Sequence, residues 1–294
     1  MPGTRYSKFT AISGYFEHDN EPEGPQFRAV TTYNLGLLHR YYSPDGTLNP
    51  IEECTQWDRF MKQLDHLNRE GKSKYMLFYV VRHGQGYHNV KEDEVGREDW
   101  EDHWARLDGD GSATWFDAHL TEKGKEQAAA INTFLRTSVV ENGLPVPMRH
   151  YTSPLSRCLE TTRIAFADLE TASIKEKPET VIKEDLRERL GIHTCDRRRT
   201  RSWIHENYPD YNIDAGFTEN DELWKPDRRE SLDEHTLRIN NLLTDIFEDN
   251  PGPVVSLSTH AGTIGALYAA TGHREVRVAT GVVVPVLVKA DLEG

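Results

Sequence analysis

Two histidines follow the strongest apolar runs of the chain, each at the point where a buried strand is expected to end. The segment 74–81 runs into Arg82 and His83, and the segment 253–258 runs into His260. Because ligands of open α/β sheets bind beyond the carboxyl ends of the strands, we expect both histidines to face one another at that edge. Imidazole changes charge near neutral pH and serves in acid–base and nucleophilic chemistry. The two histidines therefore mark a candidate reactive site.

Two arginines make the same edge suitable for an anion. Arg82 precedes the first histidine directly, and Arg157 lies in a segment whose Ser153-Pro start is typical of a helix N-terminus. Helices that begin after Ser153 and near Ala261 are expected to direct free backbone N–H groups toward this edge, where they favour anions. The planar fork of a guanidinium suits phosphate oxygens. This pattern predicts a site for a phosphate-sized group.

Each of these residues also has an ordinary structural interpretation. A lone histidine at a strand end is more often a hydrogen-bonded structural residue, and an arginine on a helix is usually solvated. The conjunction favours function here, because Arg-His-Gly, Ser-Pro-Leu-Ser-Arg and Thr-His-Ala-Gly all fall at element ends.

The sequence predicts no metal site. His193 and Cys195 form an H-x-C pair, but two ligands do not make a metal site. The segment 108–111 (DGDG) resembles the start of a calcium loop, but His119 stands where the loop needs a bidentate Glu.

Strands and helices alternate along most of the chain, which predicts an α/β fold with a largely parallel sheet. The expected strands are 74–82, 148–152, 180–183, 253–258 and 281–288. The expected helices are 53–70, 121–138, 153–169, 231–247 and 261–270, with caps at Thr121 and Ser153 and a capping box at Ser231 and Glu234. Residues 1–50 give no regular pattern.

The acidic segment 91–118 has no clear periodicity, and we expect a long loop there. Its tryptophans Trp100, Trp104 and Trp115 either anchor the loop to the core, which we favour, or cap the pocket.

Composition excludes several classes of protein. The chain of 294 residues carries a formal net charge of −13, which argues against a nucleic-acid partner. Its apolar runs are far shorter than the roughly 20 residues of a spanning helix, and its first 20 residues lack the apolar stretch of a secretory signal. Three cysteines without a CxxC pattern indicate a reducing compartment, so we expect a cytoplasmic location.

Taken together, five motifs resemble the histidine phosphatase superfamily, in its phosphoglycerate mutase-like branch, and look most like fungal phosphomutase-like proteins and their plant relatives. The motifs are RHG at 82–84 with Asn89, LTEKGKEQ at 120–127, SPLSR at 153–157 with Thr161, LRE at 186–188 and STH at 258–260. The resemblance covers roughly residues 74–290 in the right order. It implies a three-layer α/β/α sandwich around a mostly parallel sheet. Residues 73–294 would form the catalytic domain, with residues 1–72 an extension packed on it.

The resemblance also assigns roles. His83 would be the nucleophile that forms a phosphohistidine, with its other ring nitrogen donating to a carbonyl. Glu188 would be the general acid and then the base, although Glu184 and Asp185 are nearby rivals. The phosphoryl oxygens would be held by Arg82, Arg157 and His260, with Asn89 as a further donor. No cofactor is needed, because histidine and arginine supply what a metal would.

The same chemistry serves a phosphatase or a mutase. Glycolytic mutases carry Glu-Ser after Arg-His-Gly, where this chain has Gln85-Gly86, and the segment after the acid also differs. We therefore favour a phosphomonoester hydrolase acting on a small phosphorylated metabolite over a mutase, with a non-catalytic phosphate-binding protein as a third possibility. The segment 191–201 either lines the leaving-group side or is a solvated basic turn. We name Asn89, Gln85, His193 and Arg198 as candidate substrate-binding residues.

Overall fold

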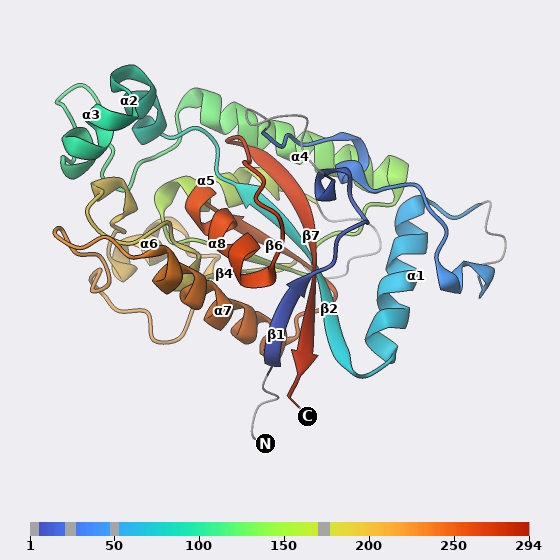
Figure 1. The fold of residues 1–294 in the computed structure, drawn as a ribbon. Helices are drawn as coiled ribbons and strands as arrows, with labels where there is room; N and C mark the ends of the chain where they lie inside the picture. The colour runs from blue at the N-terminus through green and yellow to red at the C-terminus, as the bar shows by residue number, and fades with distance from the viewer. Residues whose placement is uncertain (1–5, 21–27, 48–52, 170–176, 294) are drawn as a thin grey trace.

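The protein is described by a computed structural model that covers residues 6–20, 28–47, 53–169 and 177–293. Its centre is a seven-stranded sheet in the order β1-β7-β2-β6-β3-β4-β5. The strands are β1 (Tyr6–Ala11), β2 (Ser73–Arg82), β3 (Arg149–Thr152), β4 (Glu179–Ile182), β5 (Asn212–Ile213), β6 (Val254–Thr259) and β7 (Val282–Leu292). Helices cover both faces, as Figure 1 shows. The predicted α/β/α architecture is confirmed.

The sheet is parallel from β2 through β6, β3 and β4 to β5. The long strand β7 is antiparallel to both of its neighbours, β1 and β2. The expectation of a mostly parallel sheet is confirmed, and β7 and the unpredicted β1 complete one side of it.

The helices fall at or near the expected places, with additions. They are α1 (Gln56–Arg69), α2 (Tyr87–Val95), α3 (Arg97–Asp102), α4 (Glu122–Asn142), α5 (Ser156–Ala165), α6 (Arg201–Asn207), α7 (Leu232–Asp249) and α8 (Ala261–Thr271). The capping box of Ser231 and Glu234 is present, and Thr121 caps α4 as expected. The cap predicted at Ser153 is wrong: α5 begins later, with Leu155 at the N-cap.

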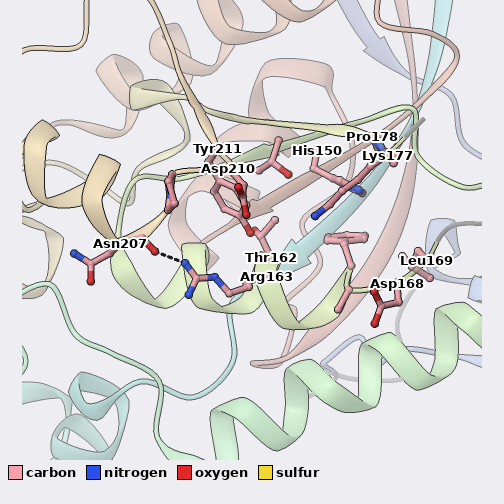
Figure 2. Close-up of a pocket in the computed structure, with 14 residues that line it drawn as sticks. His150, Thr162, Arg163, Asp168, Leu169, Lys177, Pro178, Asn207, Asp210 and Tyr211 are labelled. Atoms are coloured by element: carbon pink, nitrogen blue, oxygen red, sulfur yellow. Dashed lines mark hydrogen bonds between the residues drawn. The ribbon is translucent and has the colours of Figure 1, made fainter. Parts of the chain in front are cut away.

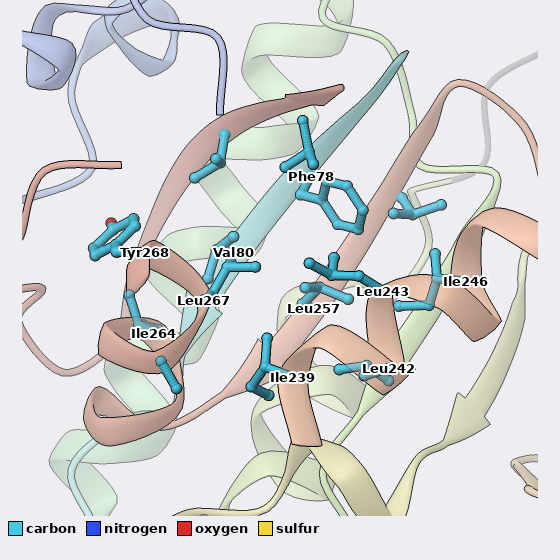
Figure 3. Close-up of a cluster of buried hydrophobic side chains, with 14 of the residues drawn as sticks. Phe78, Val80, Ile239, Leu242, Leu243, Ile246, Leu257, Ile264, Leu267 and Tyr268 are labelled. Carbon is cyan, nitrogen blue, oxygen red and sulfur yellow. The ribbon is translucent and has the colours of Figure 1, made fainter. Parts of the chain in front are cut away.

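Alternate residues of β2 enter two separate cores. Phe78 and Val80 pack with α7 and α8 on one face of the sheet, as Figure 3 shows. Leu77, Tyr79 and Val81 pack with α1, α4 and α5 on the other. Burial on both faces explains why this strand is an unbroken apolar run, as expected for a strand inside a three-layer sandwich.

The expectation that 91–118 is a loop is wrong in part, because α2 and α3 reach into it. These short helices lack a clear apolar stripe, so sequence periodicity does not reveal them. Trp100 and Trp115 are buried in a small core of their own, as the anchor interpretation expects. Trp100 also lines the largest cavity described below.

Within the residues that the structure describes, no helix combines the length and the apolar character that crossing a bilayer demands.

Candidate active site

The two histidines leave the sheet side by side. Arg82, the last residue of β2, is in register with Thr259, the last residue of β6. The next residues are therefore His83 and His260, and their ring centroids lie 5.1 Å apart. Both rings are buried. The structure therefore brings His83 and His260 together at the carboxyl edge of the sheet, as the sequence predicts.

His83 is held in a single tautomer. Its Nδ1 lies 2.7 Å from the carbonyl oxygen of Gly84. A carbonyl only accepts, so Nδ1 carries the proton and Nε2 keeps its lone pair. Burial lowers the pKa of His83 well below its usual value, and the charges of Arg157 and Arg82 lower it further. The ring is therefore neutral at pH 7, with an unprotonated nitrogen.

A close contact between two backbone segments fixes the loop that carries this ring. A Cβ atom on Gly84 would lie 2.2 Å from the carbonyl oxygen of Gly124, in the first turn of α4. A Cβ atom on Gly124 would in turn lie 2.1 Å from the carbonyl oxygen of Gln85. Only glycine fits at either position without moving the backbone.

His260 has the opposite tautomer. Its Nδ1 accepts a hydrogen bond of 3.2 Å from Nε of Arg157, so the proton is on Nε2, which lies 2.8 Å from Oγ of Ser153. Both ring nitrogens are engaged within the protein. In this arrangement the ring of His260 orients Arg157, and the expected contact of His260 with a phosphoryl oxygen stays a prediction.

Arg157 is held from several sides although it is almost completely buried. Nη1 donates to the carbonyl of Cys195 at 2.6 Å, and Nη2 pairs with Oδ1 of Asp196 at 3.0 Å. Oδ2 of Asp196 also binds Nη1 of Arg229 at 3.0 Å. A buried carboxylate between two guanidinium groups offsets the cost of burying Arg157 and fixes the direction of its fork.

The carboxylate of Glu188 lies against the N-terminus of α8. Its Oε2 accepts a hydrogen bond of 3.0 Å from the backbone N–H of Gly262. Its Oε1 accepts one of 2.9 Å from the backbone N–H of Arg189. A Cβ atom on Gly262 would lie 2.1 Å from Oε1, so the missing side chain makes room for the carboxylate.

One backbone donor at the start of each helix is already engaged within the protein. The N–H of Gly262 donates to Glu188, and the N–H of Ser156, in the first turn of α5, donates to buried Asp117 at 2.8 Å. The expected binding of an anion by the other N–H groups of these two helix starts stays a prediction.

A cavity of about 560 Å³ opens over this edge of the sheet. Arg82, His83, Asn89, Arg157 and Glu188 line it together. Seven arginines line it against five carboxylates, so the cavity is locally cationic although the chain is strongly acidic. The arginines are Arg28, Arg82, Arg97, Arg157, Arg189, Arg229 and Arg277. Clefts lined by one sign of charge attract ligands of the other.

Three further predicted residues differ in their placement. His193 lines the cavity, where its Nε2 lies 2.8 Å from a carboxylate oxygen of Glu101. Gln85 does not line it, and its side-chain oxygen accepts from Thr121 at 3.0 Å. Arg198 does not line it either.

The guanidinium of Arg198 is used inside the protein. Nε donates to Glu184 at 2.8 Å, and Nη2 donates to the carbonyl of Thr218 at 2.8 Å. The plane also stacks on Phe217. These contacts correct the prediction that Arg198 binds substrate: it ties the segment after Glu188 to the loop at 217–220.

Sequence reasoning missed several lining residues, among them His88, Arg28, Asp196 and Arg229. His88 is buried beside His83, with ring centroids 5.5 Å apart, and its Nδ1 has no partner among the described residues. Arg28, Asp196 and Arg229 come from segments that carry no recognisable pattern. The only available signal was the histidine five residues after His83, inside a motif already singled out.

A second cavity, of about 460 Å³, lies beside α5 and β4. Figure 2 shows Arg163 donating there to the carbonyl oxygen of Asn207. His150, on its wall, is hydrogen-bonded at 2.7 Å to Ser256. This second cavity is lined by none of the residues predicted to act in catalysis, so the first cavity is the candidate active site.

His193, Cys195 and Asp196 lie close enough together to be considered as metal ligands. Their surroundings do not suit a cation, because Asp196 already pairs with Arg157 and Arg229. Burial also raises the pKa of the Cys195 thiol well above its usual value, which disfavours the thiolate.

These features define an α/β protein with a buried histidine–arginine pocket at the carboxyl edge of its sheet. The family model described as "Histidine phosphatase superfamily (branch 1)" matches residues 78–279. The chain belongs to this superfamily, as its motifs indicated.

Fungal relatives match most of the chain. A "Probable phosphoglycerate mutase" of Arthroderma benhamiae is 41% identical over 96% of this chain and 84% of its own. "Phosphomutase-like protein 3" of Candida albicans is 33% identical over 96% of this chain and 80% of its own. Among solved structures, a phosphoglycerate mutase from Bacillus anthracis is 18% identical, with a TM-score of 0.46 over 74% of this chain and 90% of its own.

Proposed function

We propose that the protein is a phosphomonoester hydrolase that works through a phosphohistidine at His83. The observation that carries this proposal is the state of its ring: buried, neutral, donating through Nδ1 to Gly84 and lining a cationic cavity. Nε2 can attack phosphorus without first losing a proton.

The phosphoryl group is held by guanidinium groups. Arg82 and Arg157 both line the cavity next to His83. Nη1 of Arg82 donates to the carbonyl of Val278 at 2.7 Å, while its buried Nε has no partner among the described residues. A phosphoryl oxygen would give this donor its partner. Such charge-assisted hydrogen bonds stabilise the charge of phosphoryl transfer, which depends on positioning more than on covalent help.

Glu188 supplies the proton. Its hydrogen bonds from Arg189 and Gly262 hold the carboxyl group on the wall of the same cavity. In the first step it protonates the leaving oxygen, and in the second it takes a proton from the water that attacks the phosphohistidine. Glu184 is committed to Arg187 and Arg198, so it is not available for this role.

The leaving group carries a second anion in this proposal. Arg28 and Arg277 line the cavity, are exposed, and form no ion pair with any residue in the described ranges. Exposed cations on the wall of a cavity, without an ion-pair partner in the described part of the chain, suit a carboxylate or a second phosphate of the substrate.

The names of the relatives favour a mutase as the second candidate. A mutase passes the phosphoryl group to a second hydroxyl of a retained intermediate, while a phosphatase passes it to water. Hydrolysis is preferred because Gln85 replaces the glutamate of the glycolytic mutases and points to Thr121, outside the cavity.

Two measurements test the proposal. Purified protein should hydrolyse p-nitrophenyl phosphate and form an acid-labile phosphoenzyme, and His83→Ala should abolish both. Retained turnover in a folded His83→Ala variant would exclude this mechanism. Exposed His66 on α1 provides the control His66→Gln, which should retain full activity.

A second assay separates the two outcomes. The protein is incubated with 3-phosphoglycerate and a bisphosphate primer, and both free phosphate and 2-phosphoglycerate are measured. Phosphate release without isomer supports the hydrolase. Isomer formation faster than phosphate release would instead establish the mutase.

A further inference from the structure

A second cluster of histidines lies outside the active-site cavity. His18 and Asp19 belong to the 3-10 helix η1 (Glu17–Asp19), and His273 follows the end of α8. Their side chains are 9%, 5% and 2% exposed. One potential ligand atom from each lies within 4.8 Å of the other two.

The atoms that face each other are a carboxylate oxygen of Asp19 and the Nε2 atoms of His18 and His273. Nδ1 of His273 lies 2.7 Å from the carbonyl of Arg274, so Nδ1 carries the proton and Nε2 of the neutral ring has a lone pair. That Nε2 lies 3.3 Å from Oδ1 of Asp19. Nε2 of His18 lies 3.8 Å from the same oxygen and has no hydrogen-bond partner among the described residues. A cation between these atoms would give the buried Nε2 of His18 a partner and would separate the lone pair of neutral His273 from the carboxylate.

We propose that His18, Asp19 and His273 bind a divalent transition-metal ion, Zn²⁺, that ties the N-terminal segment to the end of α8. Two imidazoles and a carboxylate are a common zinc donor set, with water as the fourth ligand.

The spacing is close to what zinc requires. Tetrahedral ligands at about 2.0 Å from zinc lie roughly 3.3 Å from one another. The distance from Asp19 to His273 already has this value. The ring of His18 approaches Asp19 by about half an ångström on binding. The ligand atoms of His18 and His273 lie within 4.8 Å of each other, so these two rings must also approach, by at most about 1.5 Å.

The residues behind the ligands hold them in place. The second oxygen of Asp19 accepts from the backbone N–H groups of Gly14, Tyr15 and Phe16, at 2.8, 3.0 and 3.0 Å. The rings of Tyr268 and His273 stack with centroids 4.6 Å apart. Such outer contacts orient ligands and tune their affinity.

One charged group opposes the cation. Arg274 donates to the backbone carbonyls of His18 and Asp19, so its guanidinium lies beside the cluster. The carboxylate of Asp19 offsets this charge. The same two hydrogen bonds hold η1 against the segment after α8. Arg274 therefore helps to form the site, although its charge lowers the affinity for a cation there.

The bound ion would act at a distance on the active site. Residues 275–278, which begin two positions after His273, line the active-site cavity. Within this segment, the carbonyl oxygen of Arg277 accepts a hydrogen bond of 2.7 Å from the backbone N–H of Ala29. The metal would therefore fix the base of a segment that forms one cavity wall.

The test is the metal content and affinity of the full chain, prepared without a histidine tag. We expect about one Zn²⁺ per chain, and tetrahedral absorption when the chelator-stripped protein is titrated with Co²⁺. His18→Gln and His273→Gln should each weaken binding at least about tenfold. Addition of Zn²⁺ should raise the melting temperature of the wild type but not of His18→Gln.

Two controls locate the ion. Cys195→Ser would lose a metal held by the cluster in the active site, and His66→Gln would lose one held by the exposed pair of His66 and Glu70. Both variants should bind as the wild type does.

His18→Gln is the decisive variant, because Nε2 of His18 makes no hydrogen bond to a described residue and its loss should not prevent folding. Unchanged zinc affinity in folded His18→Gln would overturn the proposal. So would a wild type that binds neither Zn²⁺ nor Co²⁺, in which case a proton on His273 joins it to Asp19.

Discussion

The protein buries two histidine clusters whose surroundings carry opposite charge. In the active site, His83 and His260 lie next to Arg82 and Arg157, and these guanidinium groups help to keep both rings neutral. In the other cluster, the rings of His18 and His273 face the carboxylate of Asp19. The same side chain is thus prepared for an anion in one place and for a cation in the other.

The two clusters differ in which ring nitrogen keeps its lone pair and in which chemical group faces that nitrogen. His83 presents its lone pair to a cavity lined by donors, where an electrophilic phosphorus bearing anionic oxygens fits. His273 presents its lone pair to another acceptor. The type of residue alone therefore does not indicate the ligand; the partner of the second ring nitrogen and the nearest charge do.

After the loss of His83 itself, the largest expected effect comes from removing the planar cation of the active-site cluster. Arg157→Lys should lower kcat/KM for p-nitrophenyl phosphate by about 10²–10³-fold, because an ammonium group cannot bind Asp196, the Cys195 carbonyl and a phosphoryl oxygen together. Steady-state kinetics measure this. Arg163→Lys, on the exposed side of the same helix, should have no effect. Equal rates for wild type and Arg157→Lys would show that the cation does not contact the reacting group.

A smaller effect is expected from the carboxylate at the start of α8. Gly262→Ala should lower kcat by about 10–100-fold for substrates with poor leaving groups, because the new Cβ displaces Glu188. Gly46→Ala, away from the cavity, is the control, since its Cβ would meet nothing within 4 Å. If both variants lose the same activity, the loss does not come from Glu188.

The neutral rings of the active site should appear in the pH dependence of stability. Burial lowers the pKa of His88 well below 6.5, and Arg157 lowers it further. The unfolded chain then binds a proton below about pH 6.5 that the folded chain does not, so stability falls as the pH falls. His88→Asn should reduce this slope by about one proton, or tenfold in the unfolding constant per pH unit. Urea unfolding at several pH values between 7 and 5 measures it, and an unchanged slope would contradict a neutral His88.

The smallest effect is expected at the cavity entrance. Arg277→Gln should raise KM about 3–10-fold for phosphomonoesters that carry a second acidic group, because an exposed cation contributes modestly. The KM for p-nitrophenyl phosphate, which lacks such a group, is the internal control and should not change. A proportional rise for both substrates would place Arg277 at the phosphoryl group instead.

Much of the site could be predicted because its residues stand at element ends. His83 and His260 follow strands whose apolar runs are unmistakable, and Arg157 stands in the first turn of a helix that follows a strand. In a mostly parallel sheet, this position alone brings residues distant in the chain to one edge.

The roles of the other residues in and around the site depend on tertiary contacts that no local sequence pattern encodes. Arg198 looks as suitable for phosphate as Arg157, yet Glu184 and the 217–220 loop occupy it. Asp196, which orients Arg157, lies in a turn without periodicity. Only the folded chain shows which arginine is engaged by the protein and which faces the cavity.

The mutual approach of Gly84 and Gly124 has a consequence for how this protein can change over time. Their contact is made by main chain alone, and Thr161 and Gln127 hold the same loop through its backbone N–H groups, so none of these supports depends on the exposed arginines at the entrance. Mutations of those arginines can then alter substrate preference with little penalty in the chemical step.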